Sequence, residues 1–560
     1  MKKWNRILLL LIIIVAFILR FWALGSVPPS PDWDEVALGY DAYSIMHTGR
    51  DEFGTFMPAV LRSFDDYKPA LYTYLAIPSI AIFGLTTFAV RFPSVVMGLV
   101  GILAFYFLAR ELFGNLGKKQ AEILALLSAF LMSISPWHIQ FSHTAFETNT
   151  GLTFNLLTVL FFLKGLKKPW MLILSAFFAG MNLSVYQSER VFTPLLVLVL
   201  VIIYWKELLA VSKKYLFGSV LVGLIAILPM LSFIISHPDS LQRVQGTSLF
   251  SQQTQSIQTT INRLKDDTDN HDIVGLLIDN RRVIYAKEIV AGYLVHFDPD
   301  WLFLEGDNNR HHAPRMGLLY LLDLPFVLLG IYFLLFGPFE KKTKYIIFSW
   351  LLLAPVPAAI TFEVPHAVRT MNMLPMFLLF IAIGLTSFYA YFLENPVSRL
   401  KPFGLRIFII AVFSILAGFN FAYYLNQYFV QQNYFNAYDW QYGYEQAIPK
   451  IESIKGEYKK IVVSTKTPMD ESYMFFLFYL KYPSQKYQQL VAHGQNITTD
   501  FHHFDTYEFR TFNWSKEKVN KDVLYVGSLQ DFQNTVVARK KILYPDGTPA
   551  ILVVDPKDNL

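Results

Sequence analysis

The sequence predicts an α-helical polytopic membrane protein with about 11 transmembrane helices, amphipathic surface helices in the first outer loop and a small C-terminal α/β domain. Of the 560 residues, 54% are hydrophobic and only 16% are charged, and the mean hydropathy is +0.36, which is too apolar for an ordinary soluble protein. Apolar runs of about 18 residues recur through the first three quarters of the chain, and each can cross a hydrocarbon core of ~30 Å.

The apolar runs define the expected membrane spans. They lie at residues 7–24, 88–109, 120–137, 147–163, 170–187, 191–205, 215–236, 317–336, 343–361, 370–392 and 406–425. The first run follows a basic start but is not followed by a small-residue cleavage site, so we expect it to be an uncleaved span rather than a signal peptide.

The loop charges predict the orientation of these spans. With the N-terminus inside, the loops predicted to be cytoplasmic contain Arg110, Lys118, Lys119, Lys164, Lys167, Lys168, Lys206, Lys213, Lys214, Lys341, Lys342, Lys344, Arg399, Lys401 and Arg406. The short outer turns contain only Arg190 and Arg369. This asymmetry follows the positive-inside rule, and an odd number of spans places the C-terminus outside.

Segment 70–84 would reach only ~22 Å as a helix and contains Pro78, so we expect it to lie along the outer membrane surface rather than to cross. A helix near 36–47 is expected to do the same. The chain then divides into a transmembrane module at 1–236 with an outer loop at 25–87, an outer insertion at 237–316, further spans within 317–430, and an α/β domain at 431–560. Strand-like runs at 460–465, 522–526 and 550–555 indicate that last domain.

The absence of cysteine and the distribution of charge exclude several classes of function. The chain has no cysteine, which excludes disulfides, thiolate metal sites and cysteine nucleophiles. The net charge of +5 does not indicate nucleic-acid binding, because the basic residues lie in short loops between spans.

Polar motifs beside the first spans suggest chemistry on a lipid-linked anion. Asp34-Glu35 follows the first span, Asp66-Tyr-Lys-Pro-Ala-Leu-Tyr72 follows about 30 residues later, and Arg91-Phe-Pro-Ser94 begins the next span. In this order the motifs resemble the GT-C membrane glycosyltransferases, and within them the bacterial form of the protein O-mannosyltransferase and aminoarabinose-transferase group. The resemblance covers residues 1 to about 240 well and later spans loosely. Ala70 replaces the second proline of the usual Lys-Pro-Pro, which leaves the lysine in place.

The resemblance implies transfer of a sugar from a polyprenyl-phosphate carrier to an acceptor on the outer face. Such a reaction needs a base for the acceptor hydroxyl and cations for the leaving phosphate. Asp34 or Glu35 is a candidate base, the resemblance favouring Asp34, and Lys68 is a candidate phosphate ligand. The alternative is that the two acids cap a helix starting near Val36.

Other outer turns supply further candidates. Glu147 is the expected second catalytic carboxylate, an acid that the resemblance also implies near this turn, and simple helix capping is its alternative. Arg190, His366 and Arg369 are expected to bind the donor phosphate, with interfacial snorkelling as the alternative for Arg190. Tyr72, His143 and Tyr186 are expected to contact substrates, and His143 and Glu147 are spaced i, i+4 at a helix start.

A polar cluster near the end of the long insertion leaves a metal site open. Its members are His296, Asp298, Asp300, Asp307, His311 and His312. Histidine and carboxylate suit several divalent ions, but the spacing matches no known ligand motif, and polar packing at the interface is the alternative. The expected chemistry requires no cofactor.

We therefore expect a multi-pass, inverting glycosyltransferase of the plasma membrane, with a polyprenyl-phosphate sugar donor and a lipid, glycan or protein acceptor. A transporter or flippase of lipid-linked saccharides is the alternative. Transporters place ionisable groups near the midplane and often contain inverted repeats, whereas here no repeat is evident and the charged motifs lie at one face.

Overall fold

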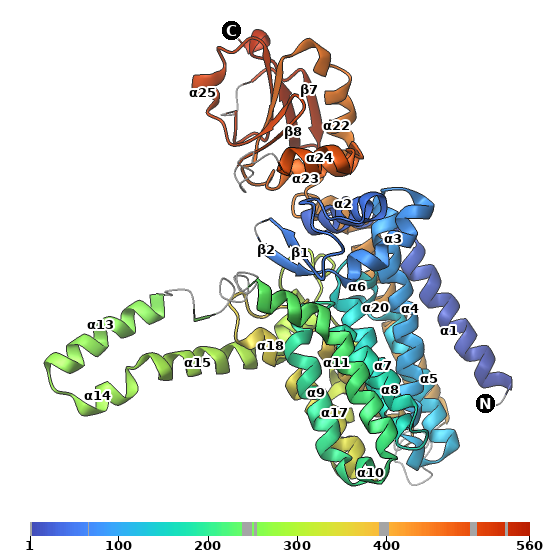
Figure 1. The fold of residues 1–560 in the computed structure, drawn as a ribbon. Coiled ribbons are helices and arrows are strands. Elements are labelled where there is room, and N and C mark those ends of the chain that lie inside the picture. The colour runs from blue at the N-terminus through green and yellow to red at the C-terminus, as the bar shows by residue number, and fades with distance from the viewer. Residues whose placement is uncertain are drawn as a thin grey trace.

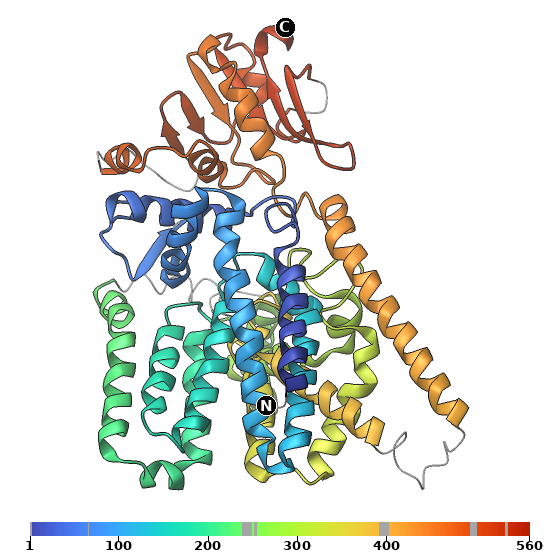
Figure 2. The same ribbon diagram turned by 90° about the vertical axis from the view of Figure 1, so that its right-hand side faces the viewer.

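The computed structural model describes residues 3–64, 66–237, 249–250, 255–390, 403–492, 501–532 and 536–559. A bundle of helices forms one part of the molecule, and a domain built on a β-sheet covers one end of that bundle (Figures 1 and 2). The N-terminus lies toward the opposite end (Figure 1).

The bundle contains a helix within each predicted span. These helices are α1 (Lys3–Phe21), α4 (Thr87–Leu112), α5 (Lys118–Ile134), α7 (Thr148–Gly165), α8 (Met171–Asn182), α9 (Glu189–Ile203), α11 (Lys213–Ser236), α16 (Leu324–Phe336), α17 (Lys341–Leu353), α19 (Leu374–Phe388) and α20 (Phe403–Asn426). Short helices α6 (Pro136–His143), α10 (Trp205–Ala210) and α18 (Val356–Ala359) lie between them. Among the described residues, five helices are long and apolar enough to cross a membrane, and α5 with α6, bent by 56°, could form a sixth span. A multi-pass membrane protein is therefore supported, while the number of crossings stays a prediction.

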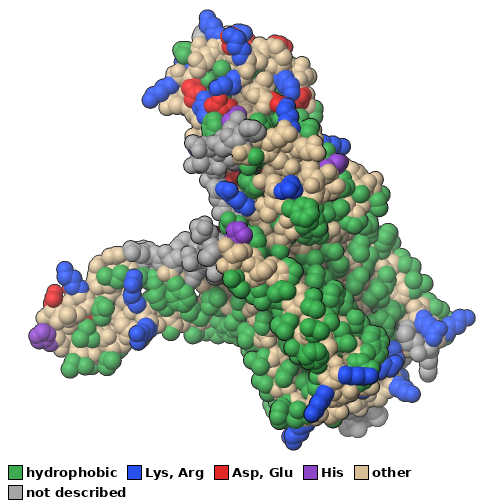
Figure 3. Space-filling view, in the orientation of Figure 1, with side chains coloured by type: hydrophobic (Ala, Val, Ile, Leu, Met, Phe, Trp, Pro, Cys, Tyr) green, Lys and Arg blue, Asp and Glu red, His purple; other side chains and the backbone are tan. Residues whose placement is uncertain are grey.

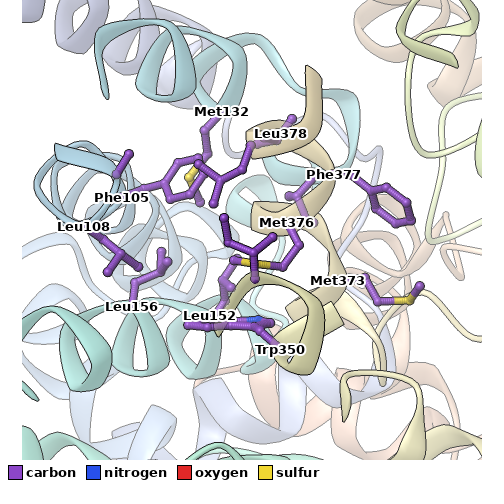
Figure 4. Packing of buried hydrophobic residues seen from close by; sticks show 14 of the residues in the cluster. Phe105, Leu108, Met132, Leu152, Leu156, Trp350, Met373, Met376, Phe377 and Leu378 are labelled. Carbon is purple, nitrogen blue, oxygen red and sulfur yellow. The ribbon is translucent and has the colours of Figure 1, made fainter. Parts of the chain in front are cut away.

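Apolar side chains from α4, α5, α7, α17 and α19 fill the centre of the bundle. Phe105, Met132, Leu152, Trp350 and Met376 are fully buried there, and Figure 4 shows them packed together. Helices α16 and α19 approach so closely that a Cβ added at Gly330 would lie 1.9 Å from the carbonyl oxygen of Phe380. Glycine is needed at this crossing because any side chain would force the two backbones apart.

The outer surface of the bundle matches a lipid environment. In the most hydrophobic windows of α11 and α20, 6% and 0% of the residues are buried, so their apolar side chains face outward. Figure 3 shows a broad hydrophobic surface and a group of lysine and arginine side chains at the end of the bundle away from the sheet domain. That distribution agrees with the predicted topology, in which the basic loops are cytoplasmic.

The described part of the insertion projects from the bundle as an arm (Figure 1). It consists of α13 (Gln255–Asp269), α14 (Ile273–Ile278) and α15 (Arg281–Leu294). After the arm, the chain returns to the bundle through residues 295–320, which contain the predicted polar cluster.

The first outer loop contains α2 (Trp33–Thr48), β1 (Val60–Ser63), β2 (Asp66–Pro69) and α3 (Leu71–Phe83). The two strands form an antiparallel hairpin that pairs Leu61 with Lys68 and that the sequence analysis did not predict. The expectation that the helix near 36–47 lies on the membrane surface is wrong, because α2 is buried on nearly all sides and shares a hydrophobic core with α3 and the sheet domain.

The C-terminal domain is a six-stranded mixed sheet with strand order β4-β5-β3-β6-β8-β7. The strands are β3 (Lys460–Val463), β4 (His502–Phe504), β5 (Tyr507–Phe509), β6 (Val523–Gly527), β7 (Lys540–Leu543) and β8 (Pro549–Val554), and the helices are α21 (Gln432–Phe435), α22 (Tyr444–Glu452), α23 (Ser472–Tyr479), α24 (Ser484–Ala492) and α25 (Trp514–Glu517). The three strand-like runs predicted from the sequence form β3, β6 and β8.

Helices α23 and α24 hold the domain on α2. A Cβ at Gly39 would lie 2.6 Å from a methyl group of Val90 and 2.7 Å from the ring of Phe478, so glycine allows α2 to fit between α4 and α23. Gln488 donates to the hydroxyl groups of Ser44 and Thr48 at 3.0 Å. The sheet domain is thus part of the structure that fixes the first outer loop.

Candidate active site

A cavity of about 650 Å³ lies where the first outer loop meets the turns at the same end of the bundle. The residues that line it are Trp33, Asp34, Lys68, Pro69, Phe146, Glu147, Tyr186, Gln187, Asp307, Asn308, Arg310, His311, Glu363, Val364, Pro365, His366, Val368 and Arg369. Six of the ten predicted site residues are among them: Asp34, Lys68, Glu147, Tyr186, His366 and Arg369. The cavity therefore brings together groups that are far apart in the sequence.

The start of α2 separates the two acids of the predicted pair. Asp32 is the N-cap, and its side chain accepts a hydrogen bond from the backbone N–H of Glu35 at 2.9 Å. Glu35 completes a capping box by accepting from the N–H of Asp32 at 3.2 Å. Asp34 takes no part in this cap and lines the cavity, with 37% of its side chain exposed. Capping thus describes Glu35, whereas Asp34 lines the cavity and its catalytic role stays a prediction.

Glu35 lies outside the cavity and is paired with Arg91. The Nε and Nη2 atoms of Arg91 each donate to one oxygen of Glu35 at 2.8 Å, and both side chains are almost fully buried. Arg91 also donates to the carbonyl oxygens of Leu24, Pro28 and Ser30. The pair therefore ties α4 to the segment that leads into α2, and the structure gives Glu35 a positioning role.

Lys68 lies on β2, and its ammonium group forms an ion pair with the carboxylate of Asp34. The lysine side chain is 8% exposed and lies 4.8 Å from the centre of the Phe64 ring. Pairing with Leu61 fixes the backbone of Lys68 in the hairpin, and its side chain lines the cavity. A buried ammonium in this setting is well suited to an oxyanion.

Glu147 and Tyr186 contribute from two other turns. Glu147 is the residue before α7, but its side chain does not cap that helix, so the capping alternative does not describe it. The prediction that His143 and Glu147 lie i, i+4 at a helix start is wrong, because α6 ends at His143 and Glu147 directly precedes α7. Tyr186 lies next to Gln187, whose amide donates to the carbonyl oxygen of Tyr67 at 3.0 Å and so holds the α8–α9 turn against the hairpin.

Three other predicted residues do not line the cavity. The hydroxyl of Tyr72 donates to the carbonyl oxygen of Val90 at 2.9 Å. His143 is fully buried, with Nδ1 2.8 Å from the carbonyl oxygen of Val27. Arg190 donates to Gln187 at 2.6 Å and to the carbonyl oxygen of Leu183. The structure therefore gives Tyr72 and His143 packing environments and places Arg190 behind the turn that carries Tyr186.

The turn between α18 and α19 supplies His366 and Arg369. The guanidinium of Arg369 donates to the hydroxyl of Thr361 at 2.7 Å and to the carbonyl oxygen of Phe362 at 2.8 Å, and it lies 3.6 Å from a carboxylate oxygen of Glu363. These contacts fix the side chain at the cavity wall, where it is 14% exposed. Arg369 therefore lines the cavity, and its phosphate-binding role stays a prediction.

Arg310 and Trp33 line the cavity but were not among the predicted residues. Arg310 forms an ion pair with Asp32 at 3.1 Å and lies 5.1 Å from the centre of the Trp33 ring. Burial raises the pKa of Asp32 to about 7, although Arg310 acts in the opposite direction. Arg310 is not one of the six residues of the predicted polar cluster, but it directly precedes His311 in the sequence. An arginine inside that polar segment was the available signal.

The predicted polar cluster is split by the structure. Asp307 and His311 line the cavity with His366, and Nδ1 of His311 lies 3.1 Å from Oδ2 of Asp307. Burial by itself would raise the pKa of Asp307, but His311 and the backbone N–H of Ala367 outweigh it and lower that pKa to about 2. Asp298 and Asp300 are exposed and lie outside this group.

The cavity as a whole presents four carboxylates, Asp34, Glu147, Asp307 and Glu363, among the cationic side chains of Lys68, Arg310 and Arg369. Of the four, Asp34 and Glu147 are the two that the sequence predicted as catalytic. A carboxylate base can take a proton from a hydroxyl group there while the cations hold an anion.

Comparisons with known proteins identify a matching family and structures of similar fold. Residues 67–233 match the family described as dolichyl-phosphate-mannose-protein mannosyltransferase. No curated protein sequence matches the chain at a significant level.

Two solved structures share the fold of nearly the whole chain. ArnT from Cupriavidus metallidurans, bound to undecaprenyl phosphate, has 12% identity and a TM-score of 0.53, and the match covers 97% of each chain. The archaeal oligosaccharyltransferase AglB from Archaeoglobus fulgidus, in complex with an inhibitory peptide and a dolichol-phosphate, has 12% identity and a TM-score of 0.52 over 94% of this chain and 70% of its own. Together with the family match, these structures confirm the resemblance to GT-C class membrane glycosyltransferases that the sequence motifs predicted.

Proposed function

We propose that this protein transfers a sugar from a polyprenyl-phosphate donor to an acceptor hydroxyl at the outer face of the cytoplasmic membrane. The observation that carries the proposal is the Asp34–Lys68 ion pair at the wall of a cavity that also contains Glu147 and Arg369. The structures of similar fold were solved with undecaprenyl phosphate and with a dolichol-phosphate, which supports a lipid-phosphate donor.

The reaction is a single displacement at the anomeric carbon. Asp34 accepts the proton of the acceptor hydroxyl, and the acceptor oxygen forms a bond to the anomeric carbon. The bond from that carbon to the phosphate oxygen breaks with its electron pair, and polyprenyl phosphate leaves. This single displacement inverts the configuration. Glu147 is the second carboxylate at the acceptor side.

Cations stabilise the leaving group. Negative charge on the phosphate increases toward the transition state, so Lys68 and Arg369 bind the transition state more tightly than the intact donor. Arg310 adds a third positive charge at the same wall.

The decisive test is transfer by the purified protein in lipid nanodiscs. Polyprenyl-phosphate sugars are supplied as donors, and the acceptor is chosen from mass spectrometry of lipids and glycans that lose a sugar in a deletion strain. We expect release of polyprenyl phosphate together with a glycosylated acceptor of inverted configuration. Movement of intact lipid-linked sugar across liposomes, without cleavage of the phosphate bond, would instead favour the transporter.

A further inference from the structure

Asp307, His311 and His366 form a compact group of metal-ligating side chains in the cavity wall. One ligand atom from each residue can be chosen so that all three lie within 4.8 Å of one another. Asp307 and His311 belong to the segment after the arm, and His366 belongs to the turn before α19. The group therefore joins two parts of the chain that are distant in sequence.

Two hydrogen bonds to neighbouring residues and one within the group orient these three residues. The backbone N–H of Ala367 donates to Oδ2 of Asp307 at 2.6 Å, which fastens the carboxylate to the turn that carries His366. The backbone N–H of His366 donates to Nε2 of His296 at 3.2 Å. An ionised carboxylate only accepts hydrogen bonds, so Nδ1 of His311 is the donor in its 3.1 Å contact with Asp307, and Nε2 of a neutral ring keeps its lone pair. Partners of this kind hold the ligands of known metal sites.

Two polar atoms of the group are left without a hydrogen-bond partner. Oδ1 of Asp307 and Nδ1 of His366 are both buried, and neither forms a hydrogen bond, while the Asp307 side chain as a whole is 8% exposed. Buried polar atoms are nearly always satisfied, because leaving one unpaired costs about 1–3 kcal/mol. If the group served only for polar packing, these two atoms would be expected to have hydrogen-bond partners. A bound cation would give both atoms a partner.

We propose that Asp307, His311 and His366 bind one divalent transition-metal ion, with Zn²⁺ as the best match. Two histidines and one carboxylate are a ligand set found in zinc enzymes, in which the fourth position is open to water or substrate. Mg²⁺ prefers oxygen ligands and does not fit two imidazoles. Tetrahedral Zn²⁺ needs donor atoms roughly 3.3 Å apart, so binding would draw the three side chains slightly together.

The open position would face the cavity and accept an anionic oxygen, for which the donor phosphate is the candidate. This second part rests on the proposed function, whereas binding of the ion does not. His366, predicted to contact the phosphate directly, would then act on it through the metal.

Metal binding can be measured without donor or acceptor. The full-length protein is purified with its affinity tag removed, stripped with a chelator and titrated with Zn²⁺, and its metal content is determined by mass spectrometry. We expect one ion per chain. Asp307→Asn and His366→Gln should each weaken binding by about 100-fold or more. Two exposed residues outside the group provide matched controls, Asp300→Asn and His47→Gln, and both should bind like the wild type.

Co²⁺ gives a spectroscopic readout that does not depend on how stable the variants are. The wild-type protein should show the visible absorption of a four-coordinate Co²⁺ site with nitrogen ligands, and Zn²⁺ should displace it. Addition of polyprenyl phosphate should then shift the Co²⁺ spectrum. An unchanged spectrum would contradict the proposal that the open coordination position accepts the donor phosphate. Absence of stoichiometric metal in the folded wild type, or equal affinity in the two site variants and the controls, would overturn the site itself. Loss of sugar transfer with metal binding intact would count against the proposed function alone.

Discussion

The ammonium group of Lys68 is ion-paired with the carboxylate of Asp34, although 34 residues separate them in the sequence. The residue expected to hold the leaving phosphate thus contacts the residue expected to act as the base. The two side chains neutralise each other in this ion pair. In the proposed reaction a phosphate that binds Lys68 would share the lysine with Asp34, so binding of the donor and activation of the base would be coupled.

Asp34→Asn should lower turnover about 10²–10⁴-fold, because the amide keeps the size and hydrogen bonding of the side chain but cannot accept a proton. Donor affinity should be largely kept. Single-turnover rates at saturating donor, measured beside equilibrium donor binding, check this prediction. Near-normal turnover in the purified variant would remove Asp34 from the role of base.

Glu35→Gln is the matched neighbour, since it makes the same chemical change one residue away. It should act mainly on stability, because it leaves the buried guanidinium of Arg91 without its counter-charge. Breaking a buried ion pair from one side costs about 3–5 kcal/mol. Thermal unfolding in detergent should show a clear decrease in Tm, which Asp34→Asn should not show. Equal Tm values for the two variants would contradict the division of roles.

Lys68→Ala should weaken binding of polyprenyl phosphate about 10–100-fold. This range corresponds to the loss of one hydrogen bond to a charged group, which contributes about 1.5–3 kcal/mol. Arg369→Ala should act in the same direction. Arg190→Ala should have a smaller effect, because its guanidinium is bound to Gln187 behind the cavity. Lys68→Arg should restore only part of the binding affinity, because a planar guanidinium group differs in reach and geometry from an ammonium group. Titration with polyprenyl phosphate compares the four variants with the wild type. Equal affinities in all five proteins would exclude binding of the donor phosphate by these cations.

Asp32 should make stability depend on pH. Its pKa in the folded protein is about 7, against an ordinary value of 3.8, so between these values the folded state keeps a proton that the unfolded chain has lost. Stability from this residue therefore falls as the pH rises through that window, by up to about 1.4 kcal/mol per pH unit. Asp32→Asn keeps the cap without the ionisation. The Tm of the variant should rise relative to the wild type from pH 4 to pH 7 and level off above, and a constant difference would contradict the prediction.

The membrane topology gives a further prediction. Reporter fusions after residues 115, 210 and 430 should read inside, inside and outside, because the basic loops are expected in the cytoplasm. An inside signal at residue 430 would place the sheet domain, and the first outer loop packed against it, on the wrong side for the proposed donor.

The structure has a helix in each apolar run that the sequence indicated, because an apolar run is a local property of the sequence. How many of these helices cross the membrane stays a prediction, since five of the described helices, or six with the bent pair, are long and apolar enough. The sequence did not predict the β1–β2 hairpin, whose strands have four residues each and show no clear alternation. The start of α2 was open to prediction: Asp32-Trp-Asp-Glu35 is a capping-box sequence, and recognising it would have moved the helix start to Trp33 and separated the two acids.

Other parts of the site depend on contacts between distant segments. Arg310 meets Asp32 across 278 residues of sequence, and no local pattern indicates that approach. His366 joins Asp307 and His311 only because two outer turns fold over the same cavity. The polar cluster in the sequence therefore indicated which segment contributes to the site. Only the fold shows which residues of that segment line the cavity.

The packing of the sheet domain on α2 has a consequence for biosynthesis. The backbone N–H of Trp33, beside Asp34, donates to the side chain of Gln441 at 2.9 Å, and Tyr40 donates to the carbonyl oxygen of Tyr482. These partners follow Trp33 and Tyr40 by 408 and 442 residues in the sequence. The loop that carries Asp34 is therefore made early but stays uncovered until the sheet domain has been made and has folded over it. A nascent chain that ends at α20 would still lack the contacts that hold this loop in place.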